Sequence, residues 1–446
     1  MRRILDTWWP LAFSWLLMGA ELPVLSAVVA RLPDPEINLA AYGGIVFSLA
    51  LIVESPVIML LAASTALCKD WASYRLVRRF MMILGGTMTA IHMLLAFTPL
   101  YYVVVEKIIG VPAEIVEPGR IGLILMIPWT WSIAYRRFNQ GIMIRFGHSQ
   151  TVSVGTVIRL GADALVLTVG YLNGTLPGIV VATLAVSTGV ISEAVYAGIA
   201  VKPVVRDELK HSPPVIPPLT SRAFLSFYIP LAMTSLIFLL AQPIGSAAIS
   251  RMPRPLESLA VWPVVTGLVF MFRSLGVAYN EVVVALLELP RSYNNLRRFA
   301  IWLAGASSAA LAVMAATPLS AFWFGMISAL NPSLVAMARL GLWLALPLPV
   351  FAVFQSWYQG AILHSRRTRG VTEAVVIYLV VSAVLYPLGV LWGEWPGLYT
   401  GLIVMGLSMG AQTVWLWYRS RPVLTEVRKR DAALSGVAPA EPVPAD

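Results

Sequence analysis

The chain is poor in cysteine, histidine and charged residues. Its single cysteine, Cys68, has no partner for an intrachain disulfide. The four histidines are scattered without metal-ligand spacing, so we expect neither a metal site nor a cofactor. Charged residues make up 12% of the 446 residues, whereas soluble proteins carry about 25%. The composition therefore excludes an ordinary soluble domain.

Motifs of common enzyme chemistry are also absent. The sequence has no nucleophile elbow, no Walker loop and no paired Asp-rich motif, so we expect a protein that is not an enzyme. Its net charge of +10 is compatible with nucleic-acid binding. The basic residues, however, lie in connections between apolar runs, where they mark topology and contact anionic headgroups. We expect membrane lipids, and no nucleic acid, as partners.

Hydrophobic residues, in contrast, form 58% of the chain and arrange in long runs. A helix needs about 18 apolar residues to cross the bilayer core, and the alternation typical of barrel strands is absent. The sequence therefore predicts an all-α polytopic membrane protein with twelve transmembrane helices. We place these spans at residues 8–30, 40–67, 79–104, 121–144, 152–172, 176–200, 223–249, 260–289, 299–326, 334–363, 371–391 and 395–418.

Lysine and arginine collect in the connections that follow even-numbered spans. Lys69, Arg75 and Arg78 follow the second span, for example, and Lys202 and Arg206 follow the sixth. The side of a membrane that carries more of these residues is normally cytoplasmic. We therefore predict a multi-pass protein of the cell (inner) membrane with both termini in the cytoplasm.

The sequence repeats itself after about 220 residues. The pattern Arg-x-Pro-x-Pro at 31–35 recurs at 251–255, and Gln-Gly at 140–141 recurs at 359–360, after one residue has dropped out of the second copy. So long a period indicates two homologous halves. With six spans each, the halves enter the membrane in the same direction, as two parallel-related six-helix bundles. Transporters are commonly built this way, with substrate held between the halves.

The predicted domain organisation follows from this repeat. We expect an N-terminal six-helix lobe at 1–201, a proline-containing cytoplasmic linker at 202–222 and a C-terminal six-helix lobe at 223–418. Residues 419–446 form a cytoplasmic tail that is basic at first and, from Asp431 onward, too rich in alanine and proline to fold. We expect the protein to act as a monomer.

Several ionisable residues lie inside predicted spans, where each costs about 2.5 to 3.5 kcal/mol near the bilayer centre. Most fall in the first half, and their counterparts are mostly uncharged, so we expect the ion-coupling or substrate-orienting site to lean to that half. Arg159 and Asp163 are four residues apart and can also pair along their own helix. Glu21 and Glu54 have no such partner and indicate either a cation site or an interhelical hydrogen bond. The candidates are Glu21, Glu54, Arg159, Asp163 and Glu193.

A second set of polar residues is a candidate for binding substrate. Arg136 and Arg137 lie near the cytoplasmic end of the fourth span, where they either line a cavity or extend to the headgroups. Gln140 and Gln359 recur in both copies and are either interhelical hydrogen bonds or substrate contacts. The candidates are Arg136, Arg137, Gln140, Arg273, Gln355 and Gln359.

Several segments resemble a known family. Residues 8–10, Pro23, Val-Ala-Arg-Leu-Pro at 29–33 and Leu-Ala-Ala-Tyr-Gly at 39–43 resemble the opening of the multidrug and toxic compound extrusion (MATE) transporters, within the MOP flippase superfamily. The segments 42–49 and 141–149 are similar to the progressive ankylosis branch.

The resemblance implies a two-lobed, twelve-helix exporter that works by alternating access. It also implies cation coupling at an acidic residue and a bent proline of the first helix, for which Glu21 and Pro23 are the nearest candidates. The progressive ankylosis branch implies export of small anions such as pyrophosphate, nucleotide or citrate. Arginines 136, 137, 159 and 273 suit such a cargo, because guanidinium groups bind phosphate and carboxylate with two parallel hydrogen bonds.

We therefore predict an efflux antiporter with alternating access that exchanges a small organic or phosphorylated solute, bound between the two lobes, for H⁺ or Na⁺. Two alternatives stay open. One is a lipid-linked saccharide flippase of the MOP superfamily. The other is a major-facilitator transporter, whose Gly-x-x-x-Asp signature after the second span is not intact here, because Ala66 stands four residues before Asp70.

Overall fold

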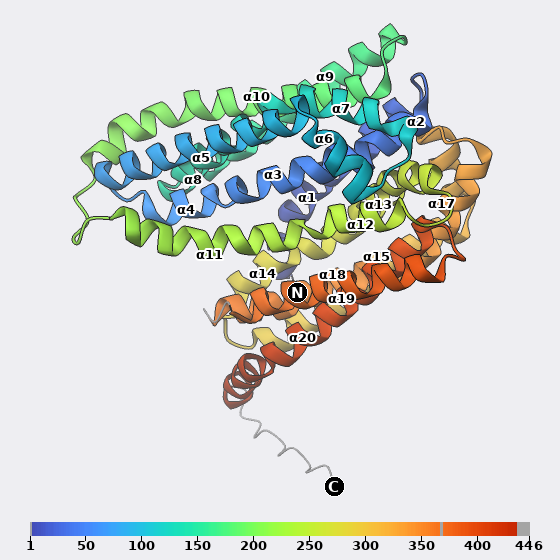
Figure 1. The fold of residues 1–446 in the computed structure, drawn as a ribbon. Coiled ribbons are helices and arrows are strands. Elements are labelled where there is room, and N and C mark those ends of the chain that lie inside the picture. Colours follow the sequence, from blue (N-terminus) through green and yellow to red (C-terminus); the bar gives the residue numbers. More distant parts are fainter. Residues whose placement is uncertain (1, 366–368, 435–446) are drawn as a thin grey trace. The chain divides into compact units, whose positions relative to one another are not determined.

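The computed structural model describes residues 2–365 and 369–434. Every regular element in these residues is helical, which confirms the all-α prediction (Figure 1). The chain divides into two compact units. Unit 1 comprises Met1–Val24, Pro263–Leu388 and Leu398–Asp446, and unit 2 comprises Leu25–Trp262 and Gly389–Gly397.

Unit 2 is built around one central helix, α8, which packs against α3, α4, α5 and α10. Figure 1 shows these helices running alongside one another. The helices of the unit are α2 (Pro35–Ala41), α3 (Phe47–Ile58), α4 (Leu60–Leu67), α5 (Trp71–Phe97), α6 (Leu100–Tyr102), α7 (Val116–Leu125), α8 (Ile127–Arg145), α9 (Ser149–Asn173), α10 (Gly178–Pro203), α11 (Ser221–Leu239) and α12 (Ala241–Ile249).

Unit 1 has an equivalent centre in α18, which packs against α14 and α15. It includes most of α1, α13, α19 and α20, whose remaining residues belong to unit 2. The helices are α1 (Arg2–Val29), α13 (Pro255–Val277), α14 (Tyr279–Leu286), α15 (Ser292–Ala316), α16 (Leu319–Phe322), α17 (Pro332–Leu344), α18 (Pro347–His364), α19 (Arg369–Trp392) and α20 (Gly397–Ala433).

The first helix of each sequence half packs against the second long helix of the other half. In unit 1 the indole N–H of Trp8 donates to the Leu275 carbonyl oxygen at 3.0 Å. In unit 2 the Tyr228 hydroxyl donates to the Pro56 carbonyl oxygen. Trp8 and Tyr228 occupy matching positions of the repeat, as do Pro56 and Leu275. Relative to the lobes predicted from sequence, 1–201 and 223–418, the first helices are therefore exchanged. Most of α1 belongs to unit 1 with the second half of the chain, and α11 and α12 belong to unit 2 with the first half.

The residue that drops out of the second copy has a structural counterpart. Between α2 and α3 the first copy contains a π-helical turn, Tyr42–Val46, whereas α13 in the second copy runs as an uninterrupted α-helix. A π turn accommodates extra backbone inside a helix, because its hydrogen bonds span five residues instead of four. The repeat spacing therefore changes at this turn while the helices on both sides keep their match.

The helices are long and apolar enough for a multi-pass membrane protein. Among the described residues, nine helical stretches meet this criterion, and the bent pair α17 and α18, with an angle of 41°, makes a tenth. The other two predicted spans, 121–144 and 395–418, also form helices, α7–α8 and α20. Helix α8 is the more polar because it carries Arg136, Arg137 and Arg145. These arginines make α8 a candidate element of the functional site.

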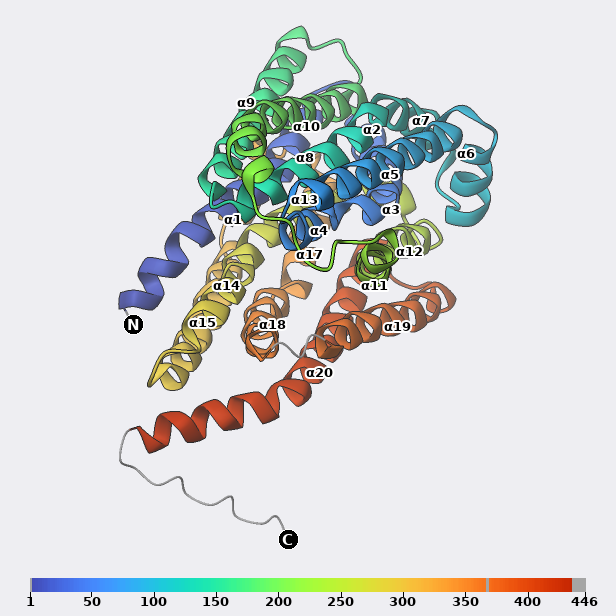
Figure 2. The ribbon, with the colours of Figure 1, turned by 90° about the vertical axis from the view of Figure 1, so that its left-hand side faces the viewer.

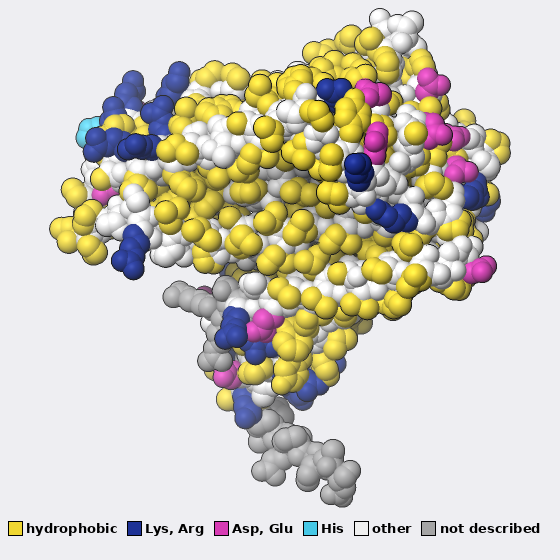
Figure 3. Space-filling view, viewed as in Figure 1, with side chains coloured by type: hydrophobic (Ala, Val, Ile, Leu, Met, Phe, Trp, Pro, Cys, Tyr) yellow, Lys and Arg dark blue, Asp and Glu magenta, His cyan; other side chains and the backbone are white. Residues whose placement is uncertain are grey.

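Some predicted boundaries were wrong. Helix α5 begins at Trp71 and α15 at Ser292, ahead of the predicted starts at 79 and 299. The first turns of both helices are basic and polar, so hydropathy excluded them although they are helical. Figure 3 shows lysine and arginine side chains gathered at the end of unit 2 where α5 starts and α10 ends. The orientation in the membrane stays a prediction.

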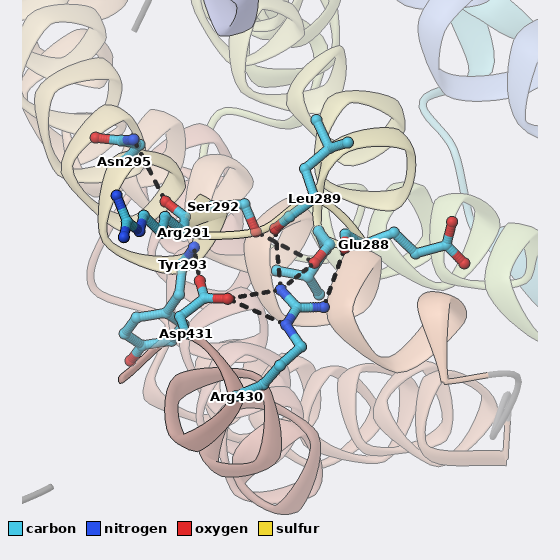
Figure 4. A network of polar contacts seen from close by, with 9 residues as sticks. Glu288, Leu289, Arg291, Ser292, Tyr293, Asn295, Arg430 and Asp431 are labelled. Atoms are coloured by element: carbon cyan, nitrogen blue, oxygen red, sulfur yellow. Dashed lines mark hydrogen bonds and ion pairs between the residues drawn. The ribbon is translucent and has the colours of Figure 1, made fainter. Parts of the chain in front are cut away.

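In unit 1 the end of α20 holds the loop between α14 and α15 (Figure 4). The Arg430 guanidinium donates to the carbonyl oxygens of Leu287, Glu288 and Leu289 at 3.0, 3.2 and 3.0 Å. Asp431 accepts the N–H of Tyr293 at 2.9 Å and so caps α15. Figure 2 shows this part of α20 passing one end of α15. The predicted disorder is thus wrong for residues 431–433, and residues 435–446 lie outside the described range.

In unit 2 the corresponding loop carries its own cap. One carboxylate oxygen of Asp70 accepts the N–H of Ser73, at the start of α5, at 2.8 Å. The other accepts the N–H of Val215, in the predicted 202–222 linker, at 2.9 Å. The linker is therefore anchored to unit 2 by this bond.

Candidate functional site

Glu54 lies on α3 beside a proline that weakens the helix. Pro56 lacks the N–H that would bond the Ile52 carbonyl oxygen, and the Ser55 hydroxyl donates to that oxygen instead, at 2.7 Å. Helix α3 ends at Ile58, and α4 begins at Leu60. Glu54 itself is only 4% exposed. The sequence thus places a buried carboxyl group next to a break between two helices.

Arg136, Gln140 and Glu193 form a closed polar group between α8 and α10. Arg136 and Gln140 are one helical turn apart, so both side chains face α10. The Arg136 guanidinium donates to one oxygen of the Glu193 carboxylate, and the Gln140 amide donates to the other at 2.8 Å. All three residues are at most 5% exposed. Both oxygens of the carboxylate are therefore satisfied by α8.

Arg159 and Asp163 form the predicted pair along α9, with 3.8 Å between the Arg159 Nε and an Asp163 carboxylate oxygen. A glycine of α10 makes room for this pair. A Cβ atom at Gly189 would lie 1.7 Å from the other Asp163 oxygen. Close approach of α9 to α10 therefore depends on glycine at this position.

These side chains make up one ionic cluster. Glu54 interacts electrostatically with Arg137 most strongly, and then with Arg136 and Arg159. Arg137 interacts in turn with Glu193. The cluster holds three guanidinium and three carboxyl groups on α3, α8, α9 and α10, and its charges balance if all are ionised. We refer to residues Glu54, Arg136, Arg137, Arg159, Asp163 and Glu193 as the ionic cluster.

Unit 1 contains a cavity of 240 Å³. Arg273 of α13 and the pair Asn280 and Glu281 of α14 line it, together with Gln355 and Gln359 of α18. The indole of Trp15, on the exchanged helix α1, completes the wall and hydrogen-bonds Glu281. The cavity therefore combines side chains from both sequence halves, all within unit 1.

The cavity lies at the repeat positions that the ionic cluster occupies in unit 2. At a spacing of 219 residues, Gln355 matches Arg136 and Gln412 matches Glu193. The ion pair of unit 2 is replaced by a neutral hydrogen bond from Gln355 to Gln412 at 3.2 Å. At the same spacing Arg273 matches Glu54. The two units thus place different chemistry at one position of the fold.

The predicted site residues therefore separate into two groups. Arg136, Arg137 and Gln140 lie in unit 2 with Glu54, Arg159, Asp163 and Glu193, whereas Arg273, Gln355 and Gln359 line the cavity of unit 1. Glu21 is half-buried on α1 in unit 1, and it is not among the described residues that line the cavity. The buried ion pairs of the predicted set lie in the first half of the sequence, whereas the cavity lies in unit 1. The location of the ion-coupling or substrate-orienting site stays a prediction.

Glu281 and Trp15 were missed from sequence. Glu281 falls inside the predicted span 260–289, so a search for every charge within a span would have found it. Trp15 carried no such signal, because tryptophan is common near membrane interfaces. Its place at the cavity follows from the exchange of α1.

Comparison with solved structures identifies the fold. The chain superposes on an inward-facing MATE-family multidrug resistance transporter of the MOP superfamily with a TM-score of 0.69 and 15% identity, covering 92% of this chain and 96% of the other. A MOP superfamily transporter from Pyrococcus furiosus, described as having a binding pocket of reverse polarity, gives 0.58 and 17%, covering 94% and 95%. The lipid II flippase MurJ gives 0.57 and 12%, covering 92% and 89%.

The protein therefore has the all-helical fold of MATE transporters in the MOP superfamily, as the sequence resemblance implied. No family model and no curated protein matches the sequence. The comparisons do not confirm the progressive ankylosis branch.

Proposed function

We propose that the protein is an alternating-access secondary transporter of the cell membrane that exports a small organic or phosphorylated solute in exchange for H⁺ or Na⁺. It acts as a monomer with both termini in the cytoplasm. The shared fold with MATE-family transporters over 92% of the chain supports this function. Segments 42–49 and 141–149 support a relationship to the progressive ankylosis branch.

The observation that carries the proposal is the ionic cluster. Buried ion pairs are often no more stable than apolar side chains of the same volume, because desolvation offsets their attraction. A chain that keeps six ionisable groups on packed membrane helices therefore gains something other than stability. A transporter gains a coupling device, because a proton or cation bound at one carboxyl group changes the charge balance of the whole cluster.

Within the cluster, Glu54 is our candidate for ion binding. Glu193 is held by two donors from α8, and Asp163 is held by Arg159 on its own helix. Glu54 instead interacts through space with Arg137 and lies near the break between α3 and α4. Neutralising Glu54 would release Arg137 from its main attraction. Ion binding at Glu54 would therefore change the electrostatic forces beside the break between α3 and α4, where the helix can bend.

Transport in proteoliposomes tests the proposal. Organic cations, pyrophosphate, nucleotides and citrate are offered as cargo under a proton or Na⁺ gradient. We expect Glu54→Gln to lower gradient-driven flux at least tenfold. Glu21→Gln tests the second candidate for ion coupling, and Arg273→Ala tests the candidate for binding an anionic cargo. Glu114→Gln, in an exposed turn, should keep wild-type flux. Unchanged flux in all three site variants would remove these residues from the mechanism, and no flux of any cargo by the wild type would contradict the function.

A lipid-linked saccharide flippase is the second candidate, because the fold is shared with the lipid II flippase MurJ. A flipping assay with a fluorescent lipid-linked saccharide distinguishes the two candidates.

A further inference from the structure

We propose that the cavity of unit 1 is a binding site for a small anion with a carboxylate or phosphate group, held by Arg273. The inference names the substrate class of the proposed transporter and so rests on that function. It differs from the sequence hypothesis, in which Arg136 and Arg137 also orient the anion, because Arg136 already pairs with the Glu193 carboxylate.

The charge on Arg273 is not balanced by the protein. Among the described residues no carboxylate pairs with it, its buried Nε has no hydrogen-bond acceptor, and its electrostatic partner is the Tyr378 hydroxyl. Burying an uncompensated charge is costly. A guanidinium group that faces a cavity gains most from an anion, to which it donates two parallel hydrogen bonds.

The carboxylate in the same cavity already has a donor. Glu281 is exposed and accepts a hydrogen bond from the Trp15 indole. Glu281 therefore has both solvent and the Trp15 indole as partners, whereas Arg273 has no carboxylate partner among the described residues and a buried Nε without an acceptor. This difference favours an anionic ligand over a cationic one.

Unit 2 shows how the same position of the fold holds a carboxylate. There Gln140 donates to the built-in carboxylate of Glu193 at 2.8 Å. In unit 1 the matching glutamine, Gln359, lines the cavity, but Glu193 is replaced by the neutral Gln412. The carboxylate is missing while one of its donors is retained and Arg273 is added. We infer that the ligand supplies the anionic group that the protein itself supplies in unit 2.

Binding to the purified protein in detergent tests the inference by isothermal titration. The probes are inorganic phosphate, succinate, glycine as a zwitterion and tetramethylammonium as a cation. We expect phosphate or succinate to bind the wild type, and Arg273→Gln to weaken binding at least tenfold. Arg273→Lys should weaken it less, because lysine keeps the charge and loses the two-point geometry. Glu281→Gln should bind the anion at least as tightly as the wild type.

The control is Arg297→Gln, which removes an exposed arginine of α15 and should leave binding unchanged. A thermal unfolding temperature for each variant identifies any loss of folding. Selective binding of glycine or tetramethylammonium, or anion binding that Arg273→Gln leaves intact, would overturn the anion site. Absence of anion binding in a protein that still transports an organic cation would reject this inference and keep the proposed function, whereas anion binding without transport would do the reverse.

Discussion

Units 1 and 2 solve the same packing problem with different chemistry. Where unit 2 joins α8 to α10 by the ion pair of Arg136 with Glu193, unit 1 joins α18 to α20 by a hydrogen bond between two glutamines, Gln355 and Gln412. The same substitution occurs one helix away. The Arg159 and Asp163 ion pair of α9 is replaced in α19 by two neutral residues, Tyr378 and Ser382.

The comparison shows that the fold does not require the charges. Neutral side chains hold the same helices together in unit 1, so packing alone does not explain the ionic cluster of unit 2. Replacement of the built-in ions leaves unit 1 with a cavity and with Arg273 lacking a carboxylate partner among the described residues. Unit 2 has its countercharges fixed in the chain. We interpret the arrangement in unit 1 as suited to a ligand and that in unit 2 as suited to a coupling ion.

The largest difference between the units should appear when one partner of a helix pair is removed. Glu193→Leu leaves the buried Arg136 without its carboxylate, and we expect a loss of about 3 to 5 kcal/mol. Gln412→Leu, at the matching position of unit 1, removes one neutral hydrogen bond and should cost about 1 kcal/mol. The thermal unfolding temperature of each purified variant provides the measurement.

A double variant shows whether the loss comes from the orphaned charge. Arg136→Met combined with Glu193→Leu replaces both ions by apolar groups, and it should recover most of the stability that Glu193→Leu alone loses. Equal losses of stability in Glu193→Leu and Gln412→Leu would mean that removing a partner of the ion pair costs no more than removing a partner of the neutral hydrogen bond.

A smaller effect should separate the units at a glycine. Position 189 is glycine in unit 2, and its match in unit 1 is Ser408, which accepts a hydrogen bond from the Ser382 hydroxyl at 2.9 Å. We expect Gly189→Ala to cost about 1 to 3 kcal/mol, because the new Cβ would collide with the Asp163 carboxylate. Thermal unfolding again measures the cost.

The matched control for this substitution is Gly161→Ala on α9, where a Cβ atom would meet nothing within 4 Å. Alanine is the better helix former, so this variant should be neutral or slightly more stable than the wild type. If both substitutions had the same effect, close packing of α9 on α10 would not depend on position 189.

Local features of the sequence predicted the structure better than distant ones. The twelve helical segments follow from apolar runs, and the Arg159 and Asp163 pair follows from a spacing of four residues. The bond from Trp8 to Leu275 joins residues 267 apart, and that from Arg136 to Glu193 joins residues 57 apart. No periodicity indicates either, because both depend on which helices become neighbours. The repeat was visible, but the exchange of its first helices was not.

The smallest predicted effect concerns how the two units cap their third long helix. In unit 2 the cap is local, since Asp70 accepts the N–H group of Ser73, three residues further along the chain. In unit 1 it comes from a remote residue, Asp431, which is 138 positions from Tyr293. We expect Asp70→Ala to cost about 1 kcal/mol near neutral pH, the usual value for a lost cap.

The pH dependence of this cost identifies the carboxylate as its source. Burial alone would raise the pKa of Asp70, but hydrogen bonds from Ser73 and Val215 outweigh it and hold the pKa below the ordinary value of 3.8. The folded chain therefore binds this proton less readily than the unfolded chain. The contribution to stability is complete above pH 3.8 and is lost as the pH falls through the lower, folded-state pKa.

The difference in unfolding temperature between wild type and Asp70→Ala should therefore become smaller on acidification from pH 6 to below the folded-state pKa of Asp70. Asp70→Asn retains an oxygen that can cap α5 but carries no charge, so its stability relative to Asp70→Ala should not vary with pH over the same interval. If the difference between wild type and Asp70→Ala stayed constant on acidification, the Asp70 side chain would cap α5 without any contribution from its charge. The carboxylate would then add nothing to anchoring Val215 of the linker.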